Sequence, residues 1–304
     1  MREVALAIDA VRQLFPDAEI RMNERMSQHT SFRIGGPVSV MFLPKSIEEL
    51  QQICKSIRDF SIRTIVIGNG TNLLVDDKPM EIAVIKIGEG MSRIALTDET
   101  VIQAESGAIL SKVAAFAMNH ALCGFEFAHG IPGSVGGAVC MNAGAYGGEI
   151  KDVIRSVTTL SDDGKFYAYS GEECLFSYRQ SRFSDGRGIV LSVEIALQKG
   201  NREEIKARMD ELSARRKNSQ PLQMPSAGST FKRPATGYAA AMIEQAGLKG
   251  FGVGGAQVSE KHAGFIINRG GATFEDVLKT MEHVQETIYK KFGVTLIPEV
   301  KIIK

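Results

Sequence analysis

The chain is poor in several residue types, and each scarcity removes a class of protein. Its 304 residues include no tryptophan, five histidines and four cysteines. The cysteines, Cys54, Cys123, Cys140 and Cys174, form no CxxC pair and no metal-ligand spacing, so we expect reduced thiols and no metal site. No run of about 18 apolar residues occurs, and the first 15 residues lack the apolar core of a signal peptide. We therefore expect a cytoplasmic protein without a membrane partner.

The sequence also lacks an excess of positive or negative charge. The 36 Lys and Arg residues nearly balance 35 Asp and Glu residues, which leaves a net charge of +1. No long basic run is present, so nothing indicates a nucleic-acid partner. Hydrophobic residues at 44% and charged residues at 23% are typical of a globular chain, and the length suggests two or three domains. We expect a monomer.

Secondary-structure signals mix helices and strands without a regular βαβ alternation, which favours the α+β class. Residues 46–60 predict a helix with a capping box at Ser46 and Glu49. Asn201 and Thr273 precede two further helices, and a composition change near residue 200 suggests a domain boundary. The other predicted elements are helices at 1–15, 107–120 and 237–250, and strands at 62–68, 82–88, 100–107, 153–160, 164–170, 188–197 and 294–303.

A first glycine loop follows the strand at 62–68, which we expect to be buried. Gly68-x-Gly70 resembles half of a dinucleotide fingerprint, but the third glycine is absent because position 73 is Leu. A Rossmann unit also needs a helix directly after the loop, and Asp76, Asp77 and Pro79 break the chain there. We do not expect a Rossmann site.

A second glycine loop, "HGIPGSVGGAVCMNAGAYGGE" at 129–149, holds seven glycines. Glycines at this density let consecutive N–H groups point at one anion, and a pyrophosphate is the natural guest. A series of tight turns with no ligand is the alternative. Two such loops favour a large phosphate-bearing cofactor.

Seven motifs occur in order along the chain: "TSFRIGG" (30–36), "GNGTNLLV" (68–75), "GIPGSVGGAVCMNAGAYGGE" (130–149), "YRQSRF" (178–183), "SAGSTFKRP" (226–234), "GLKGFGVGGAQVSEKHAGFIIN" (247–268) and "PEV" (298–300). Together they resemble the UDP-N-acetylenolpyruvoylglucosamine reductase family. The resemblance implies non-covalently bound FAD in a vanillyl-alcohol-oxidase (PCMH) type fold plus a separate substrate-binding domain. It also implies lobes at 1–67 and 68–200, with 295–304 returning to the second, and a substrate domain at 201–294.

The matched motifs also imply the residues that hold the ligands. No tyrosine lies between Arg179 and Ser229, so the chain resembles the shorter form of the family, which lacks a tyrosine-bearing loop. Substrate contacts fall on Tyr178, Arg233, Lys249 and His262. The FAD contacts are Arg33, Ile34, Gly68, Asn69, Gly70, Thr71, Asn72, Leu73, Gly130, Ile131, Pro132, Gly133, Ser134, Gly136, Gly137, Asn142, Ala143, Gly144 and Ala145.

The implied reaction uses NADPH to reduce the enolpyruvyl ether of a UDP-sugar in peptidoglycan precursor synthesis, a step of cell-wall biogenesis and cell division. Hydride from flavin N5 adds to a carbon β to a carboxylate, so negative charge develops on a group that is already anionic. Arg179 suits that carboxylate, because a guanidinium grips it with two parallel hydrogen bonds. Ser229, in the turn-rich "SAGST", matches the proton donor, and we expect it at the start of a strand. Glu299 either acts as a neutral acid or orients Arg179.

Two other readings of the sequence remain open at this stage. One is an oxidase of the same flavin fold with covalent FAD, for which His129 is a candidate attachment site. The other is a nucleotide-sugar-binding module without turnover. A serine hydrolase is disfavoured because the chain contains no G-x-S-x-G motif.

Overall fold

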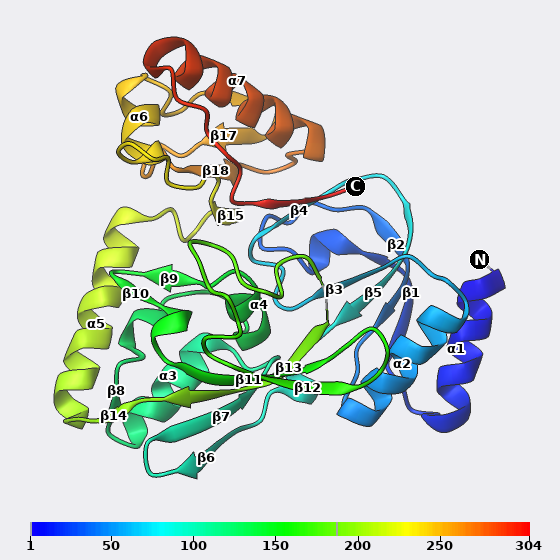
Figure 1. Ribbon diagram of the computed structural model, residues 1–304. Coiled ribbons are helices and arrows are strands. Elements are labelled where there is room, and N and C mark those ends of the chain that lie inside the picture. The colour runs from blue at the N-terminus through cyan, green and yellow to red at the C-terminus, as the bar shows by residue number, and fades with distance from the viewer. Residues whose placement is uncertain (1, 187) are drawn as a thin grey trace. The chain divides into compact units, whose positions relative to one another are not determined.

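The computed structural model describes residues 2–186 and 188–304, which divide into two compact units (Figure 1). The first unit comprises residues 1–24, 38–69 and 81–214. The second comprises residues 25–37, 70–80 and 215–304. The chain therefore crosses between the units several times, and each unit is described by itself. The predicted division into three parts stays a prediction.

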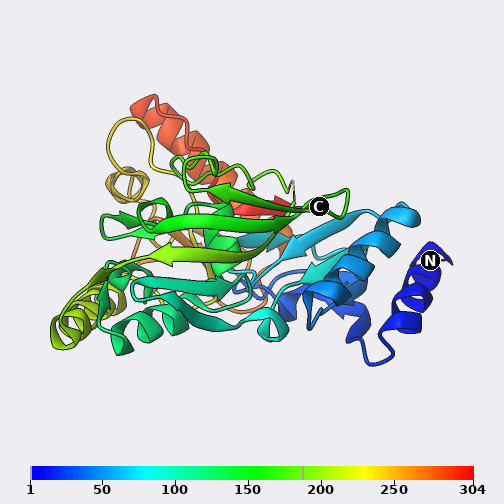
Figure 2. The same ribbon diagram turned by 60° about the horizontal axis from the view of Figure 1, so that its bottom comes forward.

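A four-stranded sheet with two helices forms one part of the first unit. Its strand order is β1 (Ile20–Arg25), β2 (Pro37–Phe42), β5 (Met80–Lys86) and β3 (Thr64–Ile67). β3 and β5 are parallel. Helices α1 (Arg2–Leu14) and α2 (Ile47–Asp59) lie beside this sheet (Figure 2), and their apolar faces share one core with β2 and β5.

A five-stranded antiparallel sheet forms the rest of the first unit. Its order is β12 (Phe166–Ser170), β11 (Ile154–Leu160), β13 (Ile189–Ala196), β7 (Val101–Glu105) and β6 (Ile94–Asp98). Side chains from α3 (Leu110–Asn119), α4 (Val135–Cys140) and α5 (Arg202–Ser219) join those of β7, β11 and β13 in one core. Two short antiparallel pairs complete the unit. β9 (Gly144–Ala145) and β10 (Gly148–Glu149) form a hairpin, and β8 (Leu122–Cys123) pairs with β14 (Gln198–Lys199) from a distant part of the chain.

The second unit has a sheet of order β15 (Ser226–Ser229), β18 (Phe265–Asn268), β17 (Ala256–Val258) and β16 (Gly252–Val253). Helices α6 (Ala239–Gln245) and α7 (Phe274–Phe292) bury their apolar faces against it. The final strand, β19 (Lys301–Ile303), pairs in parallel with β4 (Leu73–Val75). Among the described residues, 3₁₀ turns form at η1 (Met26–Gln28) in this unit and at η2 (Glu89–Met91), η3 (Glu126–Ala128) and η4 (Ile150–Asp152) in the first unit.

The helices begin at the predicted N-cap residues, but the box predicted at Ser46 and Glu49 is not reciprocal, because Glu49 Oε2 accepts from the Lys45 N–H at 2.8 Å. Ser46 Oγ accepts a hydrogen bond from the Glu49 N–H at 3.1 Å. Asn201 Oδ1 accepts from the N–H groups of Glu203 and Glu204, so it caps α5. Thr273 and Asp276 form the reciprocal capping box of α7.

Other expectations were wrong in detail. The strand predicted at 294–303 shrinks to β19, because Pro298 has no N–H and residues 297–299 bond instead with 230–232. The strand at 62–68 is not buried throughout, since Val66 is 44% exposed. The helix at 107–120 begins only at Leu110, because the chain at Gly107 turns tightly against the carbonyl groups of Gly88 and Met91.

Membrane insertion finds no support among the helices. Within residues 2–186 and 188–304, no helix combines the length and the apolar character that crossing a bilayer requires.

Candidate active site

The first glycine loop is closely packed, so a side chain at Gly68 would displace the Ser134 hydroxyl and one at Gly70 would collide with the backbone. In the first unit, a Cβ on Gly68 would lie 2.2 Å from Ser134 Oγ. In the second unit, Gly70 has φ +62°, and a Cβ there would lie 1.9 Å from the His29 carbonyl oxygen. The chain continues directly into β4 and not into a helix, which agrees with the prediction that no Rossmann unit is present.

The second glycine loop combines close backbone packing with buried polar atoms, but the N–H groups of Gly133 and Gly136 donate within the protein and do not point at one anion as predicted. Ser134 caps the short helix α4, and its Oγ accepts from the Gly137 N–H at 3.4 Å. Gly136 N–H donates to the Ser106 carbonyl oxygen, and a Cβ on Gly136 would lie 2.9 Å from Ser106 Cβ. Ser106 Oγ and His129 Nδ1 are buried and have no hydrogen-bond partner among the described residues. These glycines and orphaned polar atoms fit a polar cofactor such as FAD.

Ser106 is a residue that the sequence reasoning missed. It follows β7 directly and is only 2% exposed. The available signal was a serine followed by a glycine at the end of a predicted strand, in "AESGA". That pattern is common in turns, so it did not stand out.

Asn142, a predicted FAD contact, is fully buried and its amide is occupied by the protein. Its Nδ2 donates to the Ser177 carbonyl oxygen at 2.9 Å and to Glu149 Oε2 at 3.1 Å. Its Oδ1 accepts from the Lys151 N–H at 3.0 Å. The residue therefore links three segments of the first unit.

Arg179 lies in a tight turn with a left-handed backbone. Ser177 and Gln180 exchange N–H···O hydrogen bonds at 2.9 and 3.2 Å, and Arg179 between them has φ +54°. This is the third position of a turn, where glycine is normally favoured. Its Nη2 donates to the Gly144 carbonyl oxygen at 3.2 Å, and its guanidinium carbon lies 5.0 Å from the ring centre of Tyr178. Arg179 is half-buried, and Tyr178 is 44% exposed.

Ser229 and Glu299 belong to the second unit, where the backbone brings their segments together. Ser229 is exposed at the end of β15, not at a strand start as predicted. The Glu299 N–H donates to the Thr230 carbonyl oxygen at 2.8 Å, and Asn72 Nδ2 donates to the Glu299 carbonyl oxygen at 3.0 Å. Glu299 is half-buried and precedes β19.

Lys249 and His262 form a second polar group of the second unit. Lys249 Nζ pairs with Glu244 at 2.5 Å. Burial lowers the pKa of His262, and the nearby charge of Lys249 lowers it further. His262 Nδ1 accepts from the Gly264 N–H at 3.2 Å, so the neutral ring is the form that this contact needs. Arg233 is exposed, with its guanidinium carbon 4.4 Å from the ring centre of Tyr238.

The motif at 30–36 supplies backbone groups that could contact a ligand and side chains that belong to the core of the second unit. Arg33 is exposed with φ +56°. Ile34 is 1% exposed and packs in the core of the second unit, so only its backbone is available to a ligand. Asn268 Nδ2 fixes this turn by donating to the Phe32 carbonyl oxygen at 3.0 Å.

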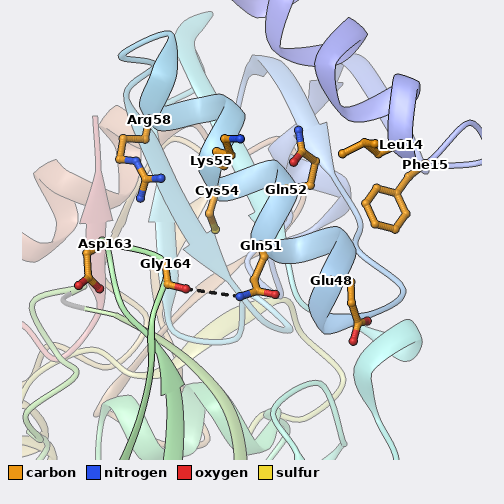
Figure 3. A pocket seen from close by; sticks show the side chains of 10 residues that line it. All are labelled: Leu14, Phe15, Glu48, Gln51, Gln52, Cys54, Lys55, Arg58, Asp163 and Gly164. Carbon is orange, nitrogen blue, oxygen red and sulfur yellow. Dashed lines mark hydrogen bonds between the residues drawn. The ribbon is translucent and has the colours of Figure 1, made fainter.

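A hollow of about 440 Å³ lies elsewhere in the first unit, along α2 (Figure 3). None of the predicted site residues lines it. Gln51 Nε2 reaches across it to the Gly164 carbonyl oxygen at 3.4 Å, and Arg58 donates to the Asp162 carbonyl oxygen. Burial raises the pKa of the Cys54 thiol to about 12, so this cysteine is no nucleophile at neutral pH.

Comparison with known proteins matches both parts of the chain. Residues 38–170 match a model described as "FAD binding domain", and residues 220–303 match "UDP-N-acetylenolpyruvoylglucosamine reductase, C-terminal domain". The chain is 49% identical to UDP-N-acetylenolpyruvoylglucosamine reductase of Caldanaerobacter subterraneus subsp. tengcongensis, covering 98% of each chain. The homologue of Syntrophomonas wolfei is 47% identical, with 95% of this chain and 96% of that one covered.

A solved structure agrees with these relatives. The crystal structure of UDP-N-acetylenolpyruvylglucosamine reductase from Thermus caldophilus matches with a TM-score of 0.80 and 34% identity. The match covers 94% of this chain and 99% of that one. Identity of this level over nearly the whole length shows that the chain belongs to the UDP-N-acetylenolpyruvoylglucosamine reductase family.

Proposed function

We propose that the protein is an FAD-dependent reductase that uses NADPH to convert UDP-N-acetylglucosamine-enolpyruvate to UDP-N-acetylmuramate. The proposal rests on the 49% identity to a UDP-N-acetylenolpyruvoylglucosamine reductase over 98% of both chains. The reaction supplies a peptidoglycan precursor. We propose that it proceeds in the cytoplasm and in a monomer.

Both glycine loops would hold the cofactor. The loop at 68–73 would let the backbone approach the cofactor closely, and Arg33 would supply a positive charge. In the loop at 130–145, the N–H groups of Gly133 and Gly136 donate within the protein, so other polar groups of that loop would contact the cofactor. Bound FAD supplies hydride transfer from NADPH to the enolpyruvyl methylene carbon. Ser106 Oγ is an additional polar atom suited to this cofactor.

Three side chains act on the substrate in this proposal. Arg179 binds the enolpyruvyl carboxylate and stabilises the negative charge that develops there during reduction. Ser229 Oγ gives its proton to C2 of the enolpyruvyl group, the carbon that becomes carbanion-like when hydride adds to the methylene. That carbon is a strong base, so a weak acid suffices as donor when it is held close. Glu299 either acts as a neutral acid or orients Arg179, and hydrogen bonds with Asn72 and Thr230 hold its backbone. Tyr178, Arg233, Lys249 and His262 would contact the nucleotide sugar.

The absorption spectrum of the purified protein tests the proposal. We expect a yellow protein whose flavin band is bleached by NADPH and restored, without oxygen, by the enolpyruvyl substrate. Mass spectrometry of the product should show a gain of two hydrogens. A colourless protein that cannot be reconstituted with FAD would favour the binding-module reading. Flavin that stays attached after denaturation would favour a covalent oxidase.

A further inference from the structure

Several residues other than glycine adopt the left-handed backbone conformation in or near the Arg179 turn, and three of them belong to one hydrogen-bonded region. Asn142 has φ +43°, and Arg179 has φ +54°. Tyr146 has φ +54° and is followed by Gly147 with φ +91°, so both central residues of the β9–β10 hairpin turn are left-handed. Non-glycine residues hold this conformation only where the surrounding structure enforces it, and such residues cluster at functional sites.

Asn142 is the residue that ties these turns together. Its two Nδ2 hydrogens go to the Ser177 carbonyl oxygen, at the base of the Arg179 turn, and to Glu149 in the hairpin. Its Oδ1 accepts from the Lys151 N–H just beyond the hairpin. Arg179 Nη2 donates to the Gly144 carbonyl oxygen at the start of the hairpin, which connects the turn and the hairpin a second time. Asn142 is completely buried, so water does not compete for these bonds.

Glu149 adds a fixed negative charge to the same network. Burial acts to raise the pKa of Glu149, but hydrogen bonds from Lys151 and Asn142 and the charges of Lys151 and Arg179 lower it overall. The carboxylate is therefore ionised at neutral pH. Lys151 Nζ lies 2.9 Å from it.

We infer that Asn142 is a positioning residue that locks the Arg179 turn onto the β9–β10 hairpin and thereby aims the guanidinium at the substrate carboxylate. The inference rests on the proposed role of Arg179. It also assigns Asn142 a different role from the predicted FAD contact, because both hydrogens of its amide are already donated within the protein. Because the Asn142 amide holds the Arg179 turn, removing that amide should change the orientation of the Arg179 guanidinium.

The two half-reactions separate this role from flavin binding. In Asn142→Ala, we expect normal FAD content and NADPH bleaching within about twofold of the parent, because Arg179 acts only on the second substrate. Anaerobic recolouring by the enolpyruvyl substrate should slow at least about tenfold, since small misplacements of a catalytic group carry costs of this size. Asn142→Asp should slow it as much or more, because its carboxylate would face the Ser177 carbonyl and Glu149.

Two further variants complete the test. Ser184→Ala removes two nearby hydrogen bonds, from Ser184 Oγ to the Cys140 carbonyl oxygen at 2.7 Å and from the Ser181 N–H to Ser184 Oγ at 2.8 Å. It leaves the hydrogen bonds of Asn142 in place and should recolour normally. Arg179→Lys measures how much the rate of recolouring depends on the guanidinium group of Arg179. If Arg179→Lys recolours slowly while both Asn142 variants recolour normally, the inference is overturned and the proposed function stands. Loss of FAD and equal slowing of both half-reactions in the Asn142 variants also overturns it. Normal recolouring in Arg179→Lys would overturn the role of Arg179 and the inference with it.

Discussion

Among the three hydroxyl residues of the "SAGST" stretch, the structure separates the candidates for proton donation. Thr230 is 1% exposed, and its Oγ1 accepts from the Ile266 N–H at 3.0 Å, so it serves the sheet. Ser226 is half-buried, and its carbonyl oxygen accepts from Ser31 Oγ. Ser229 alone of the three is exposed. The family motif selected Ser229, whose hydroxyl is accessible, and its role as proton donor stays a prediction.

Replacing Ser229 by Ala should stop the second half of the reaction while leaving the first intact. Bleaching by NADPH does not need the serine proton, whereas recolouring does. A positioned general acid contributes about 10²–10⁴-fold, so we expect recolouring to slow by at least about a hundredfold. Rapid-mixing absorbance measures both steps. Ser226→Ala is the matched control and should behave as the parent. Recolouring of Ser229→Ala at the parent rate would remove Ser229 from the mechanism.

At the scale of single residues, the sequence names candidate residues but does not predict their conformations. The motif "YRQSRF" pointed to Arg179, but nothing in it predicts a left-handed arginine. That conformation depends on Asn142 and Gly144, which lie about 35 residues away in the chain. A sequence pattern read locally does not contain such contacts.

At the scale of helices and strands, local signals were reliable and distant pairings were not. The caps at Ser46, Asn201 and Thr273 act within three residues, so the sequence alone predicts them. The final strand depends on two partners, β4 and the segment 230–232. Its apolar alternation predicted one long strand because neither partner is visible in the local pattern.

The capping box of α7 predicts a measurable contribution to stability. Thr273→Ala removes the acceptor for the Asp276 N–H, and a lost N-cap costs about 1 kcal/mol in the free energy of unfolding. Urea unfolding followed by circular dichroism measures this difference. Lys279→Ala on the same helix is the control. It removes an exposed pair with Glu275 at 3.7 Å and a weak charge interaction with Asp276, and it should cost about 0.5 kcal/mol or less. Equal losses in both variants would contradict the capping role.

Acid provides a second check on the same box. Hydrogen bonds, first from the Thr273 N–H, lower the pKa of Asp276 below its usual 3.8. Because the folded state holds this carboxylate ionised, its stabilising effect is present above about pH 4 and is lost as the pH falls through the lowered value. Asp276→Asn should therefore reduce the difference in stability between pH 5 and pH 3.

At the scale of the whole molecule, segments distant in the sequence build each unit. The second unit takes residues 25–37 and 70–80 from the N-terminal half, and no change of composition marks them. Their membership depends on tertiary contacts, such as the parallel pairing of β4 with β19 and the Phe32 turn fixed by Asn268. The family resemblance supplied the FAD fold and the separate C-terminal domain, which the matched models at 38–170 and 220–303 bear out.

Cofactor removal should destabilise the whole protein. A Cβ on Gly68 would meet Ser134 and a Cβ on Gly136 would meet Ser106, and Ser106 Oγ and His129 Nδ1 are buried without partners among the described residues. A ligand that binds only the folded state raises its stability by about 2.7 kcal/mol at 100 times its dissociation constant. Thermal unfolding of the apoprotein should therefore shift upward with each tenfold increase of FAD. FMN, which lacks the adenylate half, should shift it much less, because the loops are suited to a pyrophosphate. A melting temperature that is independent of FAD concentration would contradict the cofactor site.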